Sequence, residues 1–400
     1  MTTLAPRNAD EVIDAVRWAM SAGEALEVVG TGTRRALGRP VDAPHVLDVA
    51  ALRGVLQYEP EELVLTALPG TPLEEIESLL AARRQCLAFE PPYLTASGTL
   101  GGAVSTGLSG PRRPKAGAVR DHVLGFTAVS GRGELFKAGG KVVKNVTGYD
   151  LPKLITGSYG TLAVLTELTV KVLPAPEDTR TLIVSGQTAA DAVRTMKGVL
   201  QSTADSSAAC YLPQGISVSA IGTDAASTAF RFEGVSPSVE FRLSRLRQEL
   251  AGSGSLAVLD REASLDFWRA IRDVTPFAGE LVHALWRISV PPAQGAEVLA
   301  RIEASLPGAR AFLDWAGGLL WLQSPGEADV PRTLASEQKI RAALAQSGGH
   351  ATLVRAPAQV RRSVNVFQPQ PEALAALSYR VKQQFDPQCV LNPGRMYSGV

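Results

Sequence analysis

Apolar residues recur at helical spacing near the start of the chain and predict a helix over residues 8–22. Asn8 can cap its start, and Gly23 can end it. A strand over residues 26–29 follows and runs directly into a glycine-rich turn. The buried face of the helix is expected to comprise Val12, Ile13, Val16, Ala19 and Met20.

A second helix is predicted to follow Thr71, whose hydroxyl can act as the cap. Pro72 would take the first helical position, and Glu74 would complete a capping box. The expected buried stripe consists of Leu73, Ile76, Leu79 and Leu80.

Residues 97–118 are rich in Gly, Ser and Pro and show little periodicity, so they predict a long irregular loop, a kind of segment that is usually functional. Short strands are expected over residues 123–130, 134–138 and 162–173. The Pro174-Ala-Pro176 segment then reads as a stiff linker, which places a domain boundary near residue 175.

The second part of the chain shows one pattern twice, strand-helix-strand-strand-helix-strand, which predicts two ferredoxin-like βαββαβ units on an antiparallel sheet. The fold class is therefore α+β, with domains over residues 1–175 and 176–370 and a C-terminal segment, 371–400, that returns to the first domain. That segment carries a helix over residues 371–385. The first copy is expected at 181–185, 189–201, 216–221, 228–233, 238–250 and 256–259, and the second at 281–290, 294–305, 311–315, 319–323, 332–346 and 351–354.

Composition narrows the class of protein. The 400 residues include 40 Lys plus Arg against 39 Asp plus Glu, so no overall field attracts nucleic acid or an anionic membrane. No apolar stretch has the length of a signal peptide or a membrane span, which predicts a cytoplasmic protein without direct membrane insertion. Any association with a membrane is therefore expected to be indirect, through another protein. The cysteines, Cys86, Cys210 and Cys389, are too few and too scattered to bind an iron–sulfur cluster or structural zinc.

Two glycine-rich segments suggest a phosphate site. Gly30-Thr-Gly-Thr33 and the following Arg34 let backbone amides and hydroxyls approach a diphosphate, although an ordinary turn explains this segment alone equally well. The second segment, Ser97-Gly-Thr-Leu-Gly-Gly102, leads into a run of positive charge that implies a bound polyanion. That run contains Arg112, Arg113, Lys115 and Arg120.

A third segment, residues 144–167, completes a recognisable order. Together the three resemble the FAD-binding (PCMH-type) domain of the vanillyl-alcohol oxidase/p-cresol methylhydroxylase family. The resemblance implies FAD as the cofactor, with Asn145 and Tyr149 at the flavin face. It assigns the other cofactor contacts to Gly30, Thr31, Gly32, Thr33, Arg34, Thr99, Gly101, Gly102, Gly160, Thr161 and Leu165.

Further short motifs, including Asn392-Pro-Gly-Arg-Met-Tyr397, resemble the FAD-binding subunits of bacterial three-subunit glycolate oxidases. The resemblance implies a small 2-hydroxy acid as substrate, with a catalytic flavoprotein subunit and an iron–sulfur subunit as partners. The HxGDGNxH metal motif of related catalytic flavoproteins is absent from the sequence. The histidines are not spaced as paired ligands, so no metal site is predicted.

If the chain itself oxidises a hydroxy acid, it needs a cation for the carboxylate and a base for the hydroxyl proton. The candidates are His283, Arg287, His350 and Arg355, of which the first two would share one face of a strand over 281–290. A structural role is the more common explanation for each of them. Neither His nor Cys occurs in the diphosphate loops, so non-covalent FAD is expected. Two alternatives remain, namely a self-sufficient FAD-linked oxidase and a flavin-free structural subunit.

Overall fold

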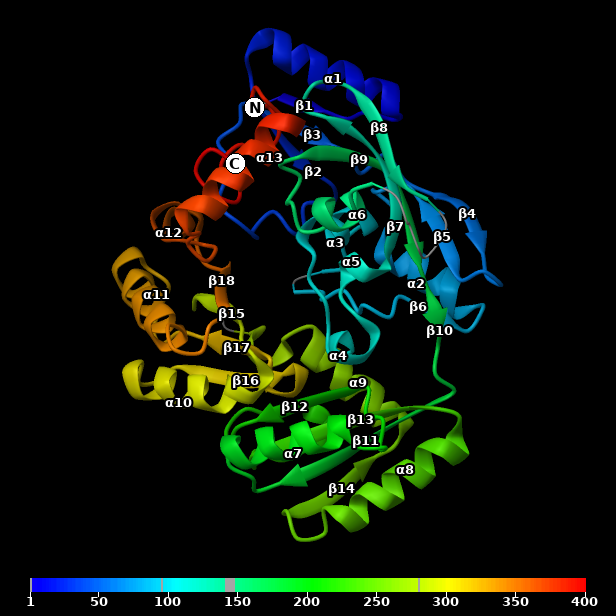
Figure 1. The fold of residues 1–400 in the computed structure, drawn as a ribbon, viewed down its shortest axis with the longest axis vertical. Helices are drawn as coiled ribbons and strands as arrows, with labels where there is room; N and C mark the ends of the chain where they lie inside the picture. Colours follow the sequence, from blue (N-terminus) through cyan, green and yellow to red (C-terminus); the bar gives the residue numbers. More distant parts are fainter. Residues whose placement is uncertain (1, 95, 141–147, 280) are drawn as a thin grey trace. The chain divides into compact units, whose positions relative to one another are not determined.

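The computed structural model describes residues 2–94, 96–140, 148–279 and 281–400. Its chain forms two compact units (Figure 1). Unit 1 comprises Met1–Ser109, Gly117–Ala175 and Pro369–Val400, whereas unit 2 comprises Gly110–Ala116 and Pro176–Gln368. Both units are therefore assembled from segments that are not contiguous in the sequence.

Unit 1 contains a small parallel sheet and a larger antiparallel one. The small sheet has the order β1-β3-β2, and the larger one has the order β4-β5-β9-β7-β8. A short pair, β6 (Gln85–Cys86) and β10 (Leu173–Pro174), lies apart from both. The remaining strands are β1 (Thr2–Leu4), β2 (Leu26–Val29), β3 (His45–Asp48), β4 (Val55–Glu59), β5 (Val64–Ala67), β7 (Val123–Ser130), β8 (Leu135–Gly139) and β9 (Ala163–Lys171).

The first predicted helix is confirmed as α1 (Ala9–Ala22). Asn8 Oδ1 accepts a hydrogen bond from the Glu11 amide at 2.9 Å, and Gly23 ends the helix at φ 68°. Val12, Val16 and Ala19 are buried and pack in one core with residues of β2 and β3. The amphipathic pattern therefore places this helix against the parallel sheet.

The second helix, α2 (Leu73–Ala81), begins one residue later than expected, and the predicted Thr71 cap is wrong. Thr71 Oγ1 donates instead to the carbonyl of Leu68 at 2.7 Å and accepts from the Gly54 amide at 2.9 Å. The hydroxyl is thus used to close the loop before the helix. The predicted buried face is confirmed for Leu73, Ile76 and Leu80, which are fully buried.

Residues 97–118 contain helices rather than an irregular loop, which corrects the prediction. The first is α3 (Leu100–Thr106), where Thr99 Oγ1 caps the start by accepting from the Gly102 amide at 3.2 Å. Leu100, Ala103 and Val104 are buried against the larger sheet's core, and this burial outweighs the weak helix propensity of the glycines. The second helix of this region is α4 (Arg113–Ala116). Beyond it lie α5 (Val119–His122) and α6 (Leu151–Ile155).

The C-terminal part of unit 1 is built around the helix α13 (Glu372–Phe385), which Figure 1 shows in red. Lys382 is fully buried and donates to Asp386 at 2.7 Å and to the carbonyls of Thr161 and Leu391 at 2.6 and 2.9 Å. A single bridge pairs Leu391 with Leu26 of β2 in parallel. The Lys382–Asp386 ion pair is thus buried, and the other ammonium protons of Lys382 are hydrogen-bonded to backbone carbonyls. The pair fixes the segment after α13 within unit 1.

Unit 2 confirms the predicted duplication. Its eight strands form one sheet in the order β14-β11-β13-β12-β16-β17-β15-β18, and all their pairings are antiparallel. Each half has the ferredoxin-like strand order, and the two halves join through β12 and β16. The strands are β11 (Asp178–Ser185), β12 (Ala208–Leu212), β13 (Ser227–Gly234), β14 (Ser255–Leu259), β15 (Leu285–Ser289), β16 (Arg310–Asp314), β17 (Leu319–Gln323) and β18 (His350–Arg355).

Four helices complete the two copies and α9 (Arg261–Arg272) connects them, while α12 (Ala358–Ser363) follows the second copy. The strand expected at residues 216–221 is wrong, because β12 lies earlier and Ser219–Ile221 forms a short 3-10 helix. All five residues of β12 are buried, so this strand lacks the alternation that marks a half-exposed one. The four helices are α7 (Ala189–Gln201), α8 (Ser236–Glu249), α10 (Gly295–Ser305) and α11 (Val330–Leu344).

Candidate cofactor site

The two glycine-rich segments of unit 1 converge. A Cβ atom placed on Gly30 would lie 3.1 Å from Thr99 Oγ1, and one on Gly98 would lie 2.9 Å from Thr33 Oγ1. The turn after β2 and the start of α3 therefore touch at positions where a larger residue would push them apart.

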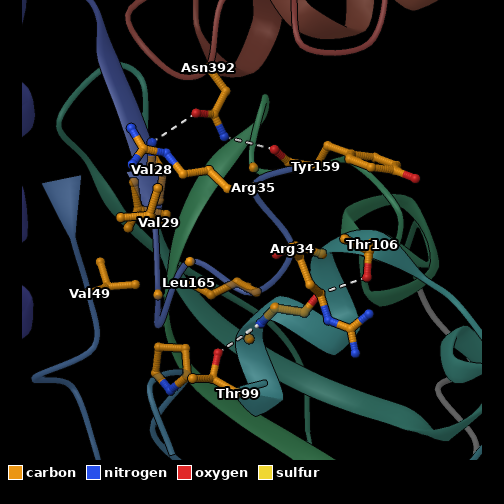
Figure 2. A pocket seen from close by; sticks show the side chains of 18 of the residues that line it. Val28, Val29, Arg34, Arg35, Val49, Thr99, Thr106, Tyr159, Leu165 and Asn392 are labelled. Carbon is orange, nitrogen blue, oxygen red and sulfur yellow. Dashed lines mark hydrogen bonds between the residues drawn. The ribbon is translucent and has the colours of Figure 1, made fainter. Parts of the chain in front are cut away.

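A cavity lies beside this contact, entirely within unit 1. Figure 2 shows Thr99 and Arg34 on one side of it, with Val28, Asn392 and Tyr159 joined by hydrogen bonds on the other. Asn392 Oδ1 accepts from the Val28 amide and Nδ2 donates to the Tyr159 carbonyl, each at 2.8 Å. The C-terminal segment thus ties β2 to the loop before β9.

The residues that line the cavity include ten of those assigned to FAD from the sequence. These are Gly30, Thr31, Gly32, Thr33, Arg34, Thr99, Gly101, Gly102, Gly160 and Leu165. Thr161 is buried outside the lining and donates to the Ser158 carbonyl at 2.8 Å. Tyr149 is 91% exposed, and Asn145 lies outside the described residues.

Sequence reasoning missed several lining residues, chiefly Ser105, Thr106, Tyr159, Asn392 and Arg395. The Asn-Pro-Gly-Arg motif at 392–395 contributed to the family resemblance, and its segment was expected to return to the first domain, but no cofactor contact was assigned to it. The backbone of Tyr159 has a left-handed conformation at φ 56°, which a non-glycine residue rarely adopts. Its backbone amide donates to the Ser105 carbonyl at 2.8 Å, so the strained turn is held against α3.

Arg34 carries a positive charge with no carboxylate partner in the part of the chain that the structure describes. Its Nη2 donates to the Pro92 carbonyl at 3.0 Å, and its Nε is buried without a hydrogen-bond partner. Burial lowers the pKa of Arg34 from 12.5 to about 10, against the opposing influence of Tyr159 and Tyr93. A desolvated cation of this kind is stabilised by an anionic ligand.

Two other arginines line the cavity and share one buried carboxylate. Arg35 Nε donates to Glu27 Oε1 at 2.9 Å, and Arg395 Nη1 lies 3.4 Å from the same oxygen. Glu27 does not line the cavity and is 5% exposed. With Arg34 included, three arginines face one glutamate, which leaves an excess of positive charge beside the glycine-rich turn. This set fits a dinucleotide, whose linked phosphates are anionic and need backbone approach.

The catalytic candidates lie in unit 2, and two of them come together. Arg287 and Arg113 place their guanidinium carbons 4.9 and 4.3 Å from the ring centroid of Trp315. Partial burial and, after it, the charges of Arg287 and Arg113 lower the pKa of His350 from 6.5, so the imidazole lies within electrostatic range of both arginines.

The other two candidates bind backbone carbonyls. His283 Nδ1 lies 2.5 Å from the Gly326 carbonyl, and Arg355 donates to the carbonyls of Phe277 and His283 at 2.8 and 3.4 Å. The strand expected over 281–290 is shorter, since β15 begins at Leu285. His283 therefore precedes the strand, and the prediction that it shares a strand face with Arg287 is wrong.

Among the described residues, no group of three or more His, Cys, Asp or Glu side chains is arranged to hold a metal ion. In the same part of the chain, every helix is too short or too polar to span a bilayer.

Comparison with known proteins gives the class first. The model of the FAD binding domain family matches residues 2–139. The structure of p-cresol methylhydroxylase with substrate bound superposes with a TM-score of 0.70 at 15% identity, covering 100% of this chain and 88% of the other. The chain is therefore a flavoprotein with an FAD-binding domain and the p-cresol methylhydroxylase fold.

Proteins of similar sequence identify the family within this class. Glycolate oxidase subunit GlcE of Escherichia coli strain K12 is 36% identical over 387 residues, which are 97% of each chain. Glycolate oxidase subunit GlcD of Bacillus subtilis strain 168 is 31% identical over 199 residues, or 49% of this chain and 42% of that protein. The chain belongs to the family of glycolate oxidase subunit GlcE, a family of FAD-dependent oxidoreductase components.

Proposed function

We propose that this chain is the FAD-holding subunit of a heteromeric 2-hydroxy-acid oxidase that acts on glycolate. The observation that carries the proposal is the convergence of the turn at 30–34 with the start of α3 around Arg34. The family relationship, which extends over nearly the whole chain, supplies the substrate class and the expectation of partner subunits.

The residues of unit 1 would bind and orient the cofactor. Arg34 would neutralise phosphate charge, and the Gly30 to Thr33 turn would approach the phosphates through its backbone. Gly160 and Leu165 would line the remaining side. When bound, FAD supplies the acceptor for a hydride or for electrons.

The cofactor is expected to bind without a covalent link. The lining of the cavity, as far as the structure describes it, contains neither His nor Cys. His122 is fully buried, with Nδ1 at 3.4 Å from the Lys171 carbonyl and its ring 5.5 Å from that of Phe89. A histidine held in this way is part of the core and is not expected to be an attachment point for FAD. Acid denaturation should therefore release free FAD.

Electrons would leave through partner subunits. Cys86, Cys210 and Cys389 are separated along the chain, and Cys210 is buried in unit 2. A cluster needs several thiolates together, so the proposed iron–sulfur centre belongs to another subunit, and a second flavoprotein would carry out the carbon chemistry.

The test compares the chain alone with the chain purified together with its partners. Each sample is scanned for the flavin absorbance band before and after glycolate is added without oxygen. We expect flavin in both samples and bleaching only in the complex. As a matched pair, Arg34→Met should lower flavin content, whereas Arg380→Met, on the exposed face of α13, should not.

The outcomes separate the alternatives. Full bleaching of the lone chain would favour a self-sufficient oxidase, which the meeting of Arg113, Arg287 and His350 in unit 2 could support by binding a carboxylate. A colourless chain that takes up no added FAD would point to a structural subunit and would overturn the proposal.

A further inference from the structure

Arg395 makes an unusual set of contacts for a residue so close to the end of the chain. It is 6% exposed, and its Nη2 donates to the carbonyls of Arg34 and Arg35 at 3.2 and 3.1 Å. Its own carbonyl accepts from the Arg39 amide at 2.8 Å. One residue therefore bonds the 34–39 loop at three backbone positions.

The same guanidinium also reaches the carboxylate behind the loop. Glu27, on β2, contacts both Arg35 and Arg395. Burial lowers the pKa of Arg395, and the nearby Glu27 charge acts in the opposite direction. Glu27 lies within strand β2, so its position is fixed. Its contact with Arg395 therefore restricts the position of the guanidinium that binds the loop.

The backbone around Arg395 is anchored independently. Asn392 binds Val28 and Tyr159, and the Leu391 carbonyl accepts from the buried Lys382 at 2.9 Å. We call residues 390–395 the C-terminal clasp. The clasp contacts β2, the 34–39 loop and the turn at Tyr159, and each of these segments contributes to the cavity or adjoins it.

We infer that Arg395 is a positioning residue for the cofactor loop, holding the backbone of Arg34 and Arg35 so that the turn is shaped for a dinucleotide's phosphates before the ligand arrives. A loop that is already ordered loses less conformational entropy on binding, so affinity depends on the clasp as well as on direct contacts. The inference rests on the proposed function only for the identity of the ligand.

The experiment measures FAD affinity by flavin fluorescence in wild-type protein and in three variants stripped of cofactor. Arg395→Met keeps most of the buried volume but removes every hydrogen bond of the guanidinium. Its dissociation constant for FAD should rise by about 10- to 100-fold, the range expected for lost hydrogen bonds to a charged group. Arg395→Lys should recover part of the affinity, and the control Arg380→Met should stay within about twofold of wild type.

Stability is followed in the same samples so that loss of folding is recognised. Apo-protein Tm and far-UV circular dichroism are recorded, and affinities are measured well below the lowest Tm. A merely structural role would lower Tm and leave the affinity of the folded fraction unchanged. In a double-mutant cycle with Glu27→Gln, the effects on affinity should be non-additive, because the Glu27 carboxylate and the Arg395 guanidinium contact each other.

Two results would overturn the inference or its basis, and they are distinguishable. If wild-type protein binds FAD and Arg395→Met binds it equally well, the positioning role is wrong while the proposed function stands. If wild-type protein binds no FAD, the proposed function itself fails.

Discussion

At the scale of single residues, two arginine side chains lie against the ring of Trp315 in unit 2. Its backbone is left-handed at φ 52°, and its indole Nε1 donates to the Gly110 carbonyl at 2.9 Å. The ring is thereby fixed and presents a surface to Arg113 and Arg287, and guanidinium groups stack favourably on indole. A histidine close to both cations loses its proton more readily than a free one.

The first prediction concerns His350. Arg287→Met removes a positive charge near the imidazole, so the pKa of His350 should rise from its lowered value towards 6.5, and Arg113→Met should act in the same direction. NMR titration of the histidine ring signals measures the change. Arg310→Met, whose guanidinium stacks on Phe277 instead, serves as the control. An unchanged His350 titration in Arg287→Met would show that the two groups are not coupled.

At the scale of elements, the candidate cofactor site depends on a short helix, α3, whose sequence does not favour helix formation. α3 contains Gly101 and Gly102 in its first turn, and glycine costs about 1 kcal/mol relative to alanine at such positions. The cap at Thr99 and burial of Leu100 and Val104 offset this cost. A change at the cap should therefore affect both the helix and the cavity that it borders.

Thr99→Ala tests this point. Loss of an N-cap should lower the free energy of unfolding by about 1 kcal/mol and also weaken FAD binding, because Thr99 lines the cavity. Thr188 caps α7 in unit 2 by the same kind of bond, at 3.2 Å to the Asp191 amide. Thr188→Ala should cost similar stability but leave FAD affinity unchanged. Urea unfolding and flavin titration measure the two effects, and equal losses of affinity would contradict the local role of Thr99.

The elements also show what could be predicted from the sequence. Regular periodicity located α1 and α7, and the repeated order of elements gave the duplicated sheet of unit 2. The apolar alternation at 216–221 was misleading, because burial of both faces removed the alternation from the true strand, β12. Tertiary contacts, rather than local pattern, decide such cases.

The residues of the candidate site were also only partly predictable from the sequence. Glycine-rich turns mark backbone that must approach a ligand, so the two segments around Gly30 and Gly101 were recognisable. Arg395 and Asn392 were not, because they lie more than 300 residues from the turn that they support. Only the fold brings them together.

At the scale of the whole molecule, segment Gly110–Ala116 belongs to unit 2 although unit 1 residues flank it on both sides. Arg112 forms an ion pair with Glu233, whose side chain is 11% exposed, and Lys115 forms one with Asp205. Burial acts to raise the pKa of Glu233, but Arg231 and Arg112 outweigh it and lower the pKa from 4.5 to about 2. This carboxylate therefore stabilises unit 2 while it is ionised.

Because the folded pKa lies below the unfolded one, the stabilisation by Glu233 is complete above pH 4.5 and is lost as pH falls towards about 2. Glu233→Gln should lower the free energy of unfolding at neutral pH by about 3 kcal/mol, since it removes the negative charge that faces the largely buried guanidinium groups of Arg112 and Arg231. It should also flatten the dependence of stability on acid pH. Tryptophan fluorescence in urea at several pH values measures both, with the exposed Glu249→Gln as the control. An acid dependence as steep as that of wild type would contradict this role.

The interleaving of the two units bears on how the protein is made. Residues 369–400 leave the ribosome after all of unit 2, yet Asn392 and Arg395 form part of the wall of the cavity in unit 1. A nascent chain that has completed only residues 1–175 lacks that part of the wall, so we expect it to bind the proposed cofactor poorly. If the cavity binds FAD as proposed, flavin is retained only after residues 392–395 have been made, and a stop codon in place of codon 392 should give a protein without flavin although both sheets are encoded in full.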